Sequence, residues 1–219
     1  RSAFQRRLID QPLMRNVIAD MVLESEAALN LSLRVARAVD NQNSNEDERS
    51  FARISTAISK YWITKRAPYL VFEALECHGG PGYIEESIMP RLYREAPLNS
   101  IWEGSGNVMC LDVLRALQRD KNALPALFRE LASAKGSNKN FDESFNHLKE
   151  TLQNPIDLEV EARLLTEKMA CLIQASIFIK SCEEEKVSAF CNSRLGPRWS
   201  GAFGTLPTDT SFEYIMGGL

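Results

Sequence analysis

One carboxylate in the sequence stands in a setting suited to acid–base chemistry. Glu103 follows an apolar pair, Ile101 and Trp102, and precedes the small residues 104–106. An apolar helix is expected to begin directly afterwards, so Glu103 would lie close to a helix N-terminus with free N–H donors. Small residues let another molecule approach the backbone closely. The residues alone leave two interpretations open: a carboxylate that acts on a flat ligand, or one that only favours the helix dipole.

Two further stretches carry groups that could hold a phosphorylated ligand. A glycine-rich turn at residues 79–82 interrupts a predicted helix, although such a turn is most often only a turn. The first residues of the chain are basic, with Arg1, Arg6 and Arg7. A guanidinium suits a diphosphate, although a charged segment end is also commonly just solvated.

These stretches resemble a known family. The runs that carry the resemblance are Glu76-Cys77-His78-Gly79-Gly80-Pro81-Gly82-Tyr83, Arg91-Leu92-Tyr93-Arg94-Glu95 and Ile101-Trp102-Glu103-Gly104-Ser105-Gly106-Asn107. They look like the C-terminal part of an acyl-CoA dehydrogenase. Over essentially the whole chain, including the tail at 201–207, the sequence is most similar to the alkylation-response (AidB-type) branch. We therefore interpret the chain as a piece of a longer protein.

The resemblance implies a reaction and a base for it. In the family, a carboxylate removes the pro-R α-proton of an acyl-CoA thioester, and the β-hydride passes to the flavin N5 of FAD. By resemblance, Glu103 is that base. Its neighbours Ile101 and Trp102 suit the role, because apolar surroundings strengthen a carboxylate as a proton acceptor. The flavin carries the electron chemistry, and the protein supplies position and the base.

The resemblance also assigns residues to the FAD site. Arg1 and Phe4 match the start of the family's Arg-x-x-Phe-Gly motif, whose arginine meets the cofactor's pyrophosphate. The glycine-rich turn matches a loop that packs against a flavin held by a neighbouring subunit, and Ser105 matches a residue that touches the flavin. The cofactor-binding residues expected from the resemblance are Arg1, Phe4, Glu76, Gly79, Gly80, Gly82, Ser105 and Asn107.

Three positions depart from the usual dehydrogenase pattern. Gln5 stands where the motif has Gly, Glu76 stands where most members have Gln, and Asn107 replaces a common Gln. A carboxylate only accepts hydrogen bonds, so Glu76 cannot donate one to an adenine or a phosphate as Gln does. The contacts at these positions are therefore expected to differ from those of ordinary members.

The composition favours a folded chain with little net charge. Of the 219 residues, 44% are hydrophobic and the net charge is -3, so neither disorder nor a basic nucleic-acid module is indicated. No run approaches 18 apolar residues, and no membrane span is expected. Five dispersed cysteines without CxxC spacing predict reduced thiols rather than a metal site. We expect a cytoplasmic protein, with mitochondria and peroxisomes left open.

The hydrophobic pattern is helical and shows no convincing strand alternation. Pro12 opens a first long helix that ends near residue 40, and a second runs over 47–76. We predict an all-α fold: an antiparallel four-helix bundle over residues 1–118, followed by a helical extension over 119–219. Helices after the second are expected over 108–118, 124–132, 141–152, 155–181 and 187–192.

The resemblance implies partners as well. The first partner is an acyl-CoA thioester as substrate. The second is another copy of the chain, because a flavin shared between subunits requires an oligomer, and the family usually forms a homotetramer built as a dimer of dimers.

AidB-type proteins are associated with DNA and with protection from alkylation, so the alternative function is a DNA-binding flavoprotein with residual dehydrogenase activity. A third possibility is that the extension mainly builds the oligomer. Without the preceding helical and β-domains, this chain alone is expected to be inactive. Candidates for a basic face in the extension are Arg119, Lys121, Arg129, Arg163, Arg194 and Arg198.

Overall fold

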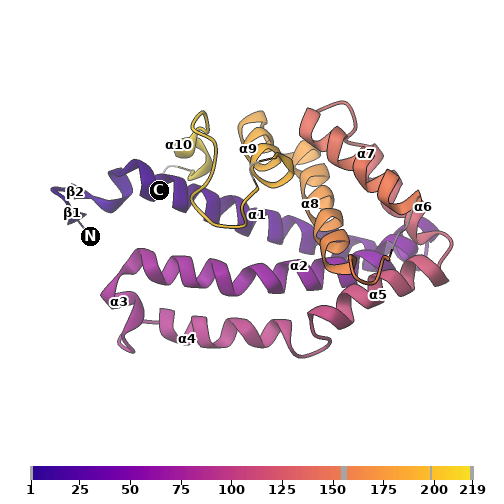
Figure 1. The fold of residues 1–219 in the computed structure, drawn as a ribbon, viewed down its shortest axis with the longest axis horizontal. Coiled ribbons are helices and arrows are strands. Elements are labelled where there is room, and N and C mark those ends of the chain that lie inside the picture. The colour runs from indigo at the N-terminus through magenta and orange to yellow at the C-terminus, as the bar shows by residue number, and fades with distance from the viewer. Residues whose placement is uncertain (1, 154–156, 198, 218–219) are drawn as a thin grey trace.

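The structure is a computed structural model that describes residues 2–153, 157–197 and 199–217. Two long helices, α1 and α2, run side by side along the molecule, and the remaining helices pack on them (Figure 1). The strands and 3-10 or π turns are β1 (Ser2–Ala3), β2 (Arg6–Arg7), η1 (Leu8–Asp10), η2 (Ala96–Ser100) and η3 (Cys191–Leu195). The α-helices are α1 (Pro12–Asn41), α2 (Glu46–His78), α3 (Gly80–Tyr83), α4 (Met89–Glu95), α5 (Gly106–Arg119), α6 (Ala123–Ala132), α7 (Lys139–Gln153), α8 (Ala162–Ser181), α9 (Glu184–Phe190) and α10 (Phe212–Ile215).

Local sequence signals set the ends of the two long helices. Pro12 begins α1, where its missing N–H costs nothing. The side chain of Asn45 caps α2 by accepting from the backbone N–H groups of Asp47 and Glu48. The last residue of α2 is His78, and Gly79 then takes a left-handed conformation with φ 64°. Such a conformation is open to glycine at little cost, so the chain can turn sharply there.

The antiparallel bundle predicted for the first half of the chain is confirmed. Helix α2 is its centre, because α1, α4, η2 and α5 all contact it. Figure 1 shows α1, α2 and the α4–η2 segment as three roughly parallel rods, with α5 continuing the third towards the extension. Among the described residues the strands are β1 and β2, which pair antiparallel over two residues each, and the rest of the chain forms helices joined by turns and loops.

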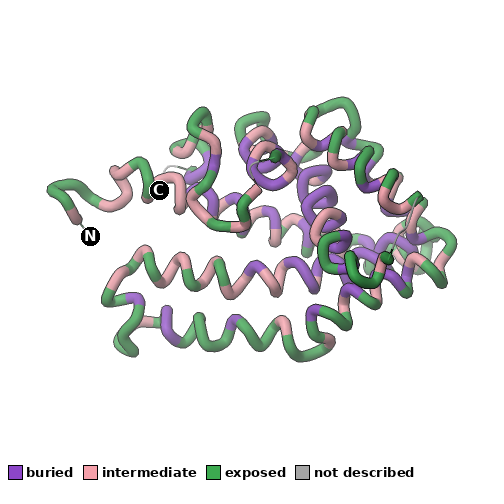
Figure 2. The backbone as a smooth tube through the Cα atoms, in the orientation of Figure 1, coloured by how far each residue is buried: buried purple, intermediate pink, exposed green. Residues whose placement is uncertain are grey.

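The later helices share one hydrophobic core with the bundle. Buried residues of α1, α2 and α5 join those of α6, α7, α8 and α9 in a single cluster. Figure 2 shows the buried positions gathered where these helices meet, whereas the positions of α4 are mostly exposed. The boundary at 118/119 remains a prediction, and the core is continuous across it.

The helix predicted over 155–181 was wrong at its start. Residues 154–156 lie outside the described residues, and α8 begins only at Ala162. Asp157 has a positive φ of 48°, and its carboxylate accepts from the N–H of Val160. A side chain that bonds the nearby backbone competes with helix formation, which explains the turn before α8.

Charged side chains tie the extension to the bundle. Arg34 of α1 bonds Glu48 of α2 and Glu130 of α6, at 2.8 and 2.9 Å, and Lys180 of α8 also pairs with Glu130. None of the helices in the described ranges is sufficiently long and apolar to span a bilayer.

Candidate functional site

The loop that carries Glu103 joins η2 to α5 and has an unusual backbone. Glu103 has φ 53° and Gly104 has φ 110°, so two consecutive residues are left-handed. For a residue with a side chain, such a conformation costs on the order of 1–3 kcal/mol and persists only where neighbours enforce it. Strain of this kind clusters at functional sites, which makes the loop the first candidate in the molecule.

One side chain of α2 contacts this loop on both sides of Glu103. The ammonium of Lys60 donates to the carbonyl oxygen of Trp102 at 2.9 Å and to that of Gly104. A Cβ at Gly104 would overlap the side chain of Met109, so the loop also packs tightly against α5. The loop is thus held from two helices.

Glu103 opens onto a groove of about 570 Å³ between the end of α1, α2 and α5. Its lining is partly apolar, with Val39, Ala57 and Met109. It also includes the guanidinium of Arg53, which donates two hydrogen bonds to the carboxylate of Asp112. The other lining residues are Gln42, Arg49, Ala52, Thr56 and Lys60. Since the second lining carboxylate, Asp112, is paired with Arg53, the groove could receive an elongated ligand beside Glu103.

The apolar surroundings expected for Glu103 do not come from this chain. Ile101 is 63% exposed and Trp102 is 56% exposed, and Glu103 is itself exposed. The reason is that η2 and the loop lie on the outer face of α2, with no described segment over them. The two side chains form an apolar surface beside the carboxylate rather than a pocket around it.

Ser105 and Asn107 stand at the start of α5. Ser105 is the N-cap residue, yet its side chain makes no capping bond, and the first N–H groups of the helix have no partner within it. The Oδ1 of Asn107 accepts from Nε of Arg163 in α8 at 2.8 Å. Lys65 of α2 lies against Gly106. Free N–H donors beside two cationic side chains are groups that suit the polar and anionic parts of FAD.

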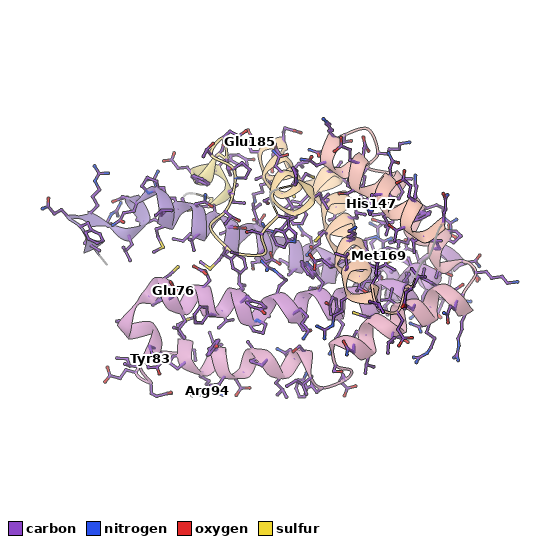
Figure 3. All side chains as sticks on the ribbon, in the orientation of Figure 1. Glu76, Tyr83, Arg94, His147, Met169 and Glu185 are labelled. Carbon is purple, nitrogen blue, oxygen red and sulfur yellow. The ribbon has the colours of Figure 1, made fainter. Side chains whose placement is uncertain are left out.

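The glycine-rich turn lies at the far end of α2, as does Glu76, which is exposed there (Figure 3). The glycines of this turn differ in what requires them. A Cβ at Gly82 would overlap the carbonyl oxygen of Leu75, so the fold itself needs this glycine. A Cβ at Gly80 would meet nothing within 4 Å, and Gly80 is exposed. Nothing in the described chain thus explains a glycine at 80, whereas a ligand or partner lying against the backbone would.

The N-terminal hairpin shows which backbone conformation the residue at position 5 must adopt. Arg1 lies outside the described residues, but Phe4 and Gln5 form the hairpin turn with φ 51° and 62°. A two-residue turn with both central φ values positive favours glycine, which is what the family motif has at this position. Phe4 is 93% exposed at the tip of the hairpin.

The structure does not bring all the predicted site residues together within one chain. The Glu103 loop contacts α2 at Lys60, whereas the glycine turn begins at Gly79, 19 positions further along the chain. At a rise of 1.5 Å per residue, Lys60 and Gly79 are about 28 Å apart along α2. Glu103, Ser105 and Asn107 form one group, and Glu76, Gly79, Gly80 and Gly82 form another.

Three residues near the first group were not predicted from the sequence: Lys60, Lys65 and Arg163. A lysine on an amphipathic helix gives no signal that it bonds carbonyls more than forty residues along the chain. Arg163 was considered only as a possible DNA contact, because nothing in the sequence indicates that α8 reaches the start of α5.

The basic face proposed for the extension is corrected by the structure. Arg194 is buried, where its guanidinium pairs with Asp20 and Glu24. Burial alone would lower the pKa of Arg194, but these two carboxylates outweigh it and raise the pKa above its usual value. A side chain in such a network cannot contact DNA.

The other five candidates differ among themselves. Arg129 pairs with Asp47, and Arg163 bonds Asn107. Arg198 lies outside the described residues, and Arg119 and Lys121 are exposed.

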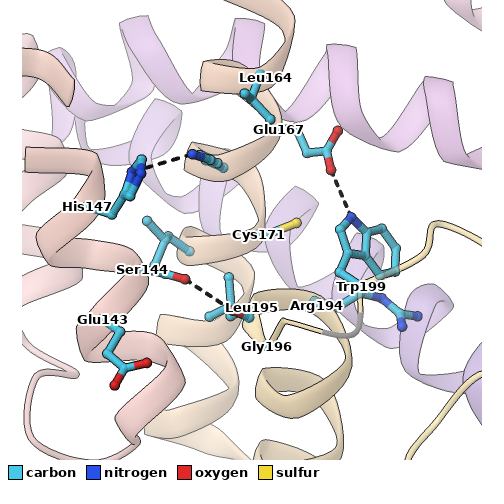
Figure 4. Close-up of a pocket in the computed structure, with 12 residues that line it drawn as sticks. Glu143, Ser144, His147, Leu164, Glu167, Cys171, Arg194, Leu195, Gly196 and Trp199 are labelled. Atoms are coloured by element: carbon cyan, nitrogen blue, oxygen red, sulfur yellow. Dashed lines mark hydrogen bonds between the residues drawn. The ribbon is translucent and has the colours of Figure 1, made fainter.

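A separate cavity of about 340 Å³ lies in the extension between α7, α8, residues 194–196 and Trp199 (Figure 4). Its lining shares no residue with the Glu103 groove. The indole N–H of Trp199 donates to Glu167 at 2.9 Å, and the Lys168 ammonium lies 3.5 Å from His147 Nδ1. Burial raises the pKa of the Cys171 thiol at its wall, so this thiol stays protonated and unreactive.

The sequence matches the family described as "Acyl-CoA dehydrogenase, C-terminal domain" over residues 1–118. It is 40% identical over 198 residues to AidB of Escherichia coli (strain K12), an acyl-CoA dehydrogenase family protein, covering 90% of this chain and 36% of AidB. The chain therefore spans about a third of the length of this relative.

Solved structures show the same fold. Caenorhabditis elegans ACDH-11 in complex with C11-CoA superposes with a TM-score of 0.78 at 24% identity, over 93% of this chain and 40% of that one. An acyl-CoA dehydrogenase from Bacillus anthracis, complexed with FAD, superposes with a TM-score of 0.61 at 18% identity, over 89% and 42%. FAD is the cofactor of the family. By its sequence match and its helical fold, this chain belongs to the acyl-CoA dehydrogenase family and carries the C-terminal domain of that family.

Proposed function

We propose that the intact protein is an FAD-dependent oxidoreductase that introduces an α,β double bond into an acyl-CoA thioester, with Glu103 as the base. The single observation that carries the proposal is the Glu103 loop. Its carboxylate stands at a strained left-handed position, fixed by Lys60 and Met109, at the edge of a partly apolar groove. The contacts of this loop and its groove distinguish Glu103 from Asp157, a carboxylate at a similar left-handed position whose side chain bonds the nearby backbone.

In this proposal, the Glu103 carboxylate accepts the α-proton of the thioester. When bound, FAD supplies the acceptor for the two electrons that leave the β-carbon. The exposed side chains of Ile101 and Trp102 form the apolar surface against which the missing part of the site closes, which would exclude water from the carboxylate and strengthen it as a base. The uncapped start of α5, with Ser105 and Asn107, would hold polar atoms of the cofactor.

The second group of residues would serve a cofactor held by a neighbouring subunit. The glycine turn and the protruding hairpin with Phe4 both expose backbone and apolar surface, and the turn begins about 28 Å along α2 from Lys60, which contacts the Glu103 loop. Arg1, outside the described residues, keeps its proposed role at the pyrophosphate by resemblance alone. A homotetramer is the proposed assembly, and the cytoplasm is the proposed location.

The test is the visible absorption spectrum of the intact protein before and after anaerobic addition of acyl-CoA thioesters. Bound flavin that bleaches with at least one thioester is the expected result, and this chain by itself is expected to show no activity. A protein that purifies with no flavin and takes up none from solution would refute the proposal.

The alternative, a DNA-binding flavoprotein of the alkylation response with residual activity, has less support. The net charge is -3, and Arg194, one of its six candidate contacts, is buried in ion pairs. We expect at most modest duplex binding that weakens steeply as salt rises from 50 to 200 mM, because phosphate contacts release counterions. Tight binding of duplex DNA by the intact protein at physiological salt would reverse the order of the two functions.

A further inference from the structure

We propose that Lys60 is a positioning residue that holds Glu103 in its left-handed conformation by bonding the carbonyls on both sides of it. The carbonyl oxygen of Trp102 belongs to the peptide unit before Glu103, that of Gly104 belongs to the peptide unit after Gly104, and one ammonium donates to both. With both ends of the Glu103–Gly104 segment held, the backbone angles of these two residues can change only together. The direction of its side chain is then determined by α2 rather than by the loop.

The other cations of the groove are committed elsewhere. Arg53 forms two bonds to Asp112, and Arg49 donates to the backbone oxygen of Gln42 at 3.1 Å. Lys60, in contrast, has no carboxylate within salt-bridge distance among the residues that the structure describes. Its charge therefore strengthens the hydrogen bonds to the two carbonyls, since the ammonium forms no ion pair among the described residues.

The position of Lys60 suits a fixed support. It lies near the middle of α2, the central helix of the bundle, beside the buried residues Ile58, Tyr61 and Trp62. A side chain anchored on a packed helix moves less than one on a surface loop, so it can impose a geometry on the loop that it contacts. The catalytic consequence of this inference rests on the proposed function, whereas the clamp itself does not.

The experiment compares three variants of the intact protein with the wild type. Lys60→Met keeps the length of the side chain and removes its donors, and Lys60→Arg keeps the charge and can donate to two carbonyls. Lys135→Met, at an exposed position without side-chain partners in the described chain, is the matched control. The first readout is amide hydrogen exchange over residues 98–108, and the second is the rate of flavin reduction by an acyl-CoA.

In Lys60→Met, we expect exchange over residues 98–108 to accelerate about tenfold or more, as loss of a charge-assisted hydrogen bond predicts. Exchange in α1 and α8 should not change. Flavin reduction should slow by on the order of 10²-fold at unchanged flavin content and unchanged affinity for the acyl-CoA, because a small misplacement of a reacting group has effects of this size. Lys60→Arg should recover most of both losses, and Lys135→Met should match the wild type.

Each outcome decides a different claim. Unchanged exchange over residues 98–108 in Lys60→Met would overturn the clamp. Faster exchange with unchanged flavin reduction would overturn its role in positioning the base. If no acyl-CoA reduces the wild type, the proposed function fails, and the exchange result still decides the clamp. Should Lys60→Met not fold, Lys60→Gln, which keeps one short donor, replaces it under the same criteria.

Discussion

At the scale of single residues, Glu103 and Gln5 show how the chain uses left-handed backbone. Both residues carry a side chain, yet their backbone has the positive φ that favours glycine, 53° at Glu103 and 62° at Gln5. At Gln5 the explanation is a tight hairpin turn, and at Glu103 it is a loop held between Lys60 and Met109. A conformation that costs free energy is retained where neighbouring contacts enforce it, and in the proposed function the one at Glu103 places the base.

The glycine turn gives a prediction at this scale. Gly80→Leu should lower flavin occupancy of the intact protein while changing its unfolding free energy by less than about 0.5 kcal/mol, because a Cβ at Gly80 meets nothing within 4 Å. Gly82→Ala is the contrast: its Cβ would overlap Leu75, so it should destabilise the protein by about 1–3 kcal/mol. Flavin absorbance per mole of protein and urea unfolding measure the two effects. Full flavin occupancy in Gly80→Leu would remove the turn from the cofactor site.

Some residues of the candidate site around Glu103 can be identified from the sequence, and others cannot. The motif around Glu103 was found by resemblance, since its residues are contiguous in the chain. Lys60, Lys65 and Arg163 reach the same region from distant segments, and only the packing of α2 and α8 on α5 brings them there. Hydrophobic periodicity indicates which face of a helix is buried, but not which carbonyl a lysine on that helix will contact.

At the scale of elements, the long helices could be predicted and their junctions could not. Proline at the start of α1 and glycine at the end of α2 are strong local signals. The turn before α8 depends on Asp157 bonding its own backbone, which competes with an apolar helical pattern. The burial of Arg194 depends on Asp20 and Glu24, residues about 170 positions away.

The contact between α1, α2, α6 and α8 gives a prediction for stability against pH. Burial alone would raise the pKa of Glu130, but its hydrogen bonds from Arg34 and Lys180 outweigh burial and lower it below its ordinary value of 4.5. A pKa that is lower in the folded state contributes stability above pH 4.5 and loses it as pH falls through the folded pKa. Glu130→Gln should therefore destabilise by about 3 kcal/mol at pH 7, and the difference from wild type should shrink below pH 4.

The control for this pH effect is Glu143→Gln. Glu143 is exposed and pairs with Lys139 at 3.7 Å, so its substitution should cost less than about 0.5 kcal/mol at either pH. Urea unfolding of the intact protein at pH 7 and at about pH 3, below the ordinary pKa of a glutamate, measures both variants. A difference between Glu130→Gln and wild type that stays constant between the two pH values would contradict the assignment.

At the scale of the whole molecule, exposed apolar side chains predict an oligomer. They extend along α1, α4 and the η2 region, and include Leu13, Leu29, Leu33, Ile88, Leu92, Leu98, Ile101 and Trp102. Apolar surface of this extent marks contact with other domains or subunits. The intact protein should sediment as a tetramer at micromolar concentration. A strict monomer that still binds flavin would show that the glycine turn does not serve a neighbouring subunit.

The central claim, that Glu103 is the base, is tested most directly by anaerobic stopped-flow reduction of the flavin in wild type and Glu103→Gln. Short, branched and long acyl-CoAs serve as substrates. The substitution of Glu103 by Gln is nearly isosteric and removes only the ability to accept a proton, so flavin content and melting temperature should not change. The account predicts that the variant is reduced on the order of 10²–10⁴-fold more slowly than wild type. Equal rates of reduction in the two proteins would contradict it.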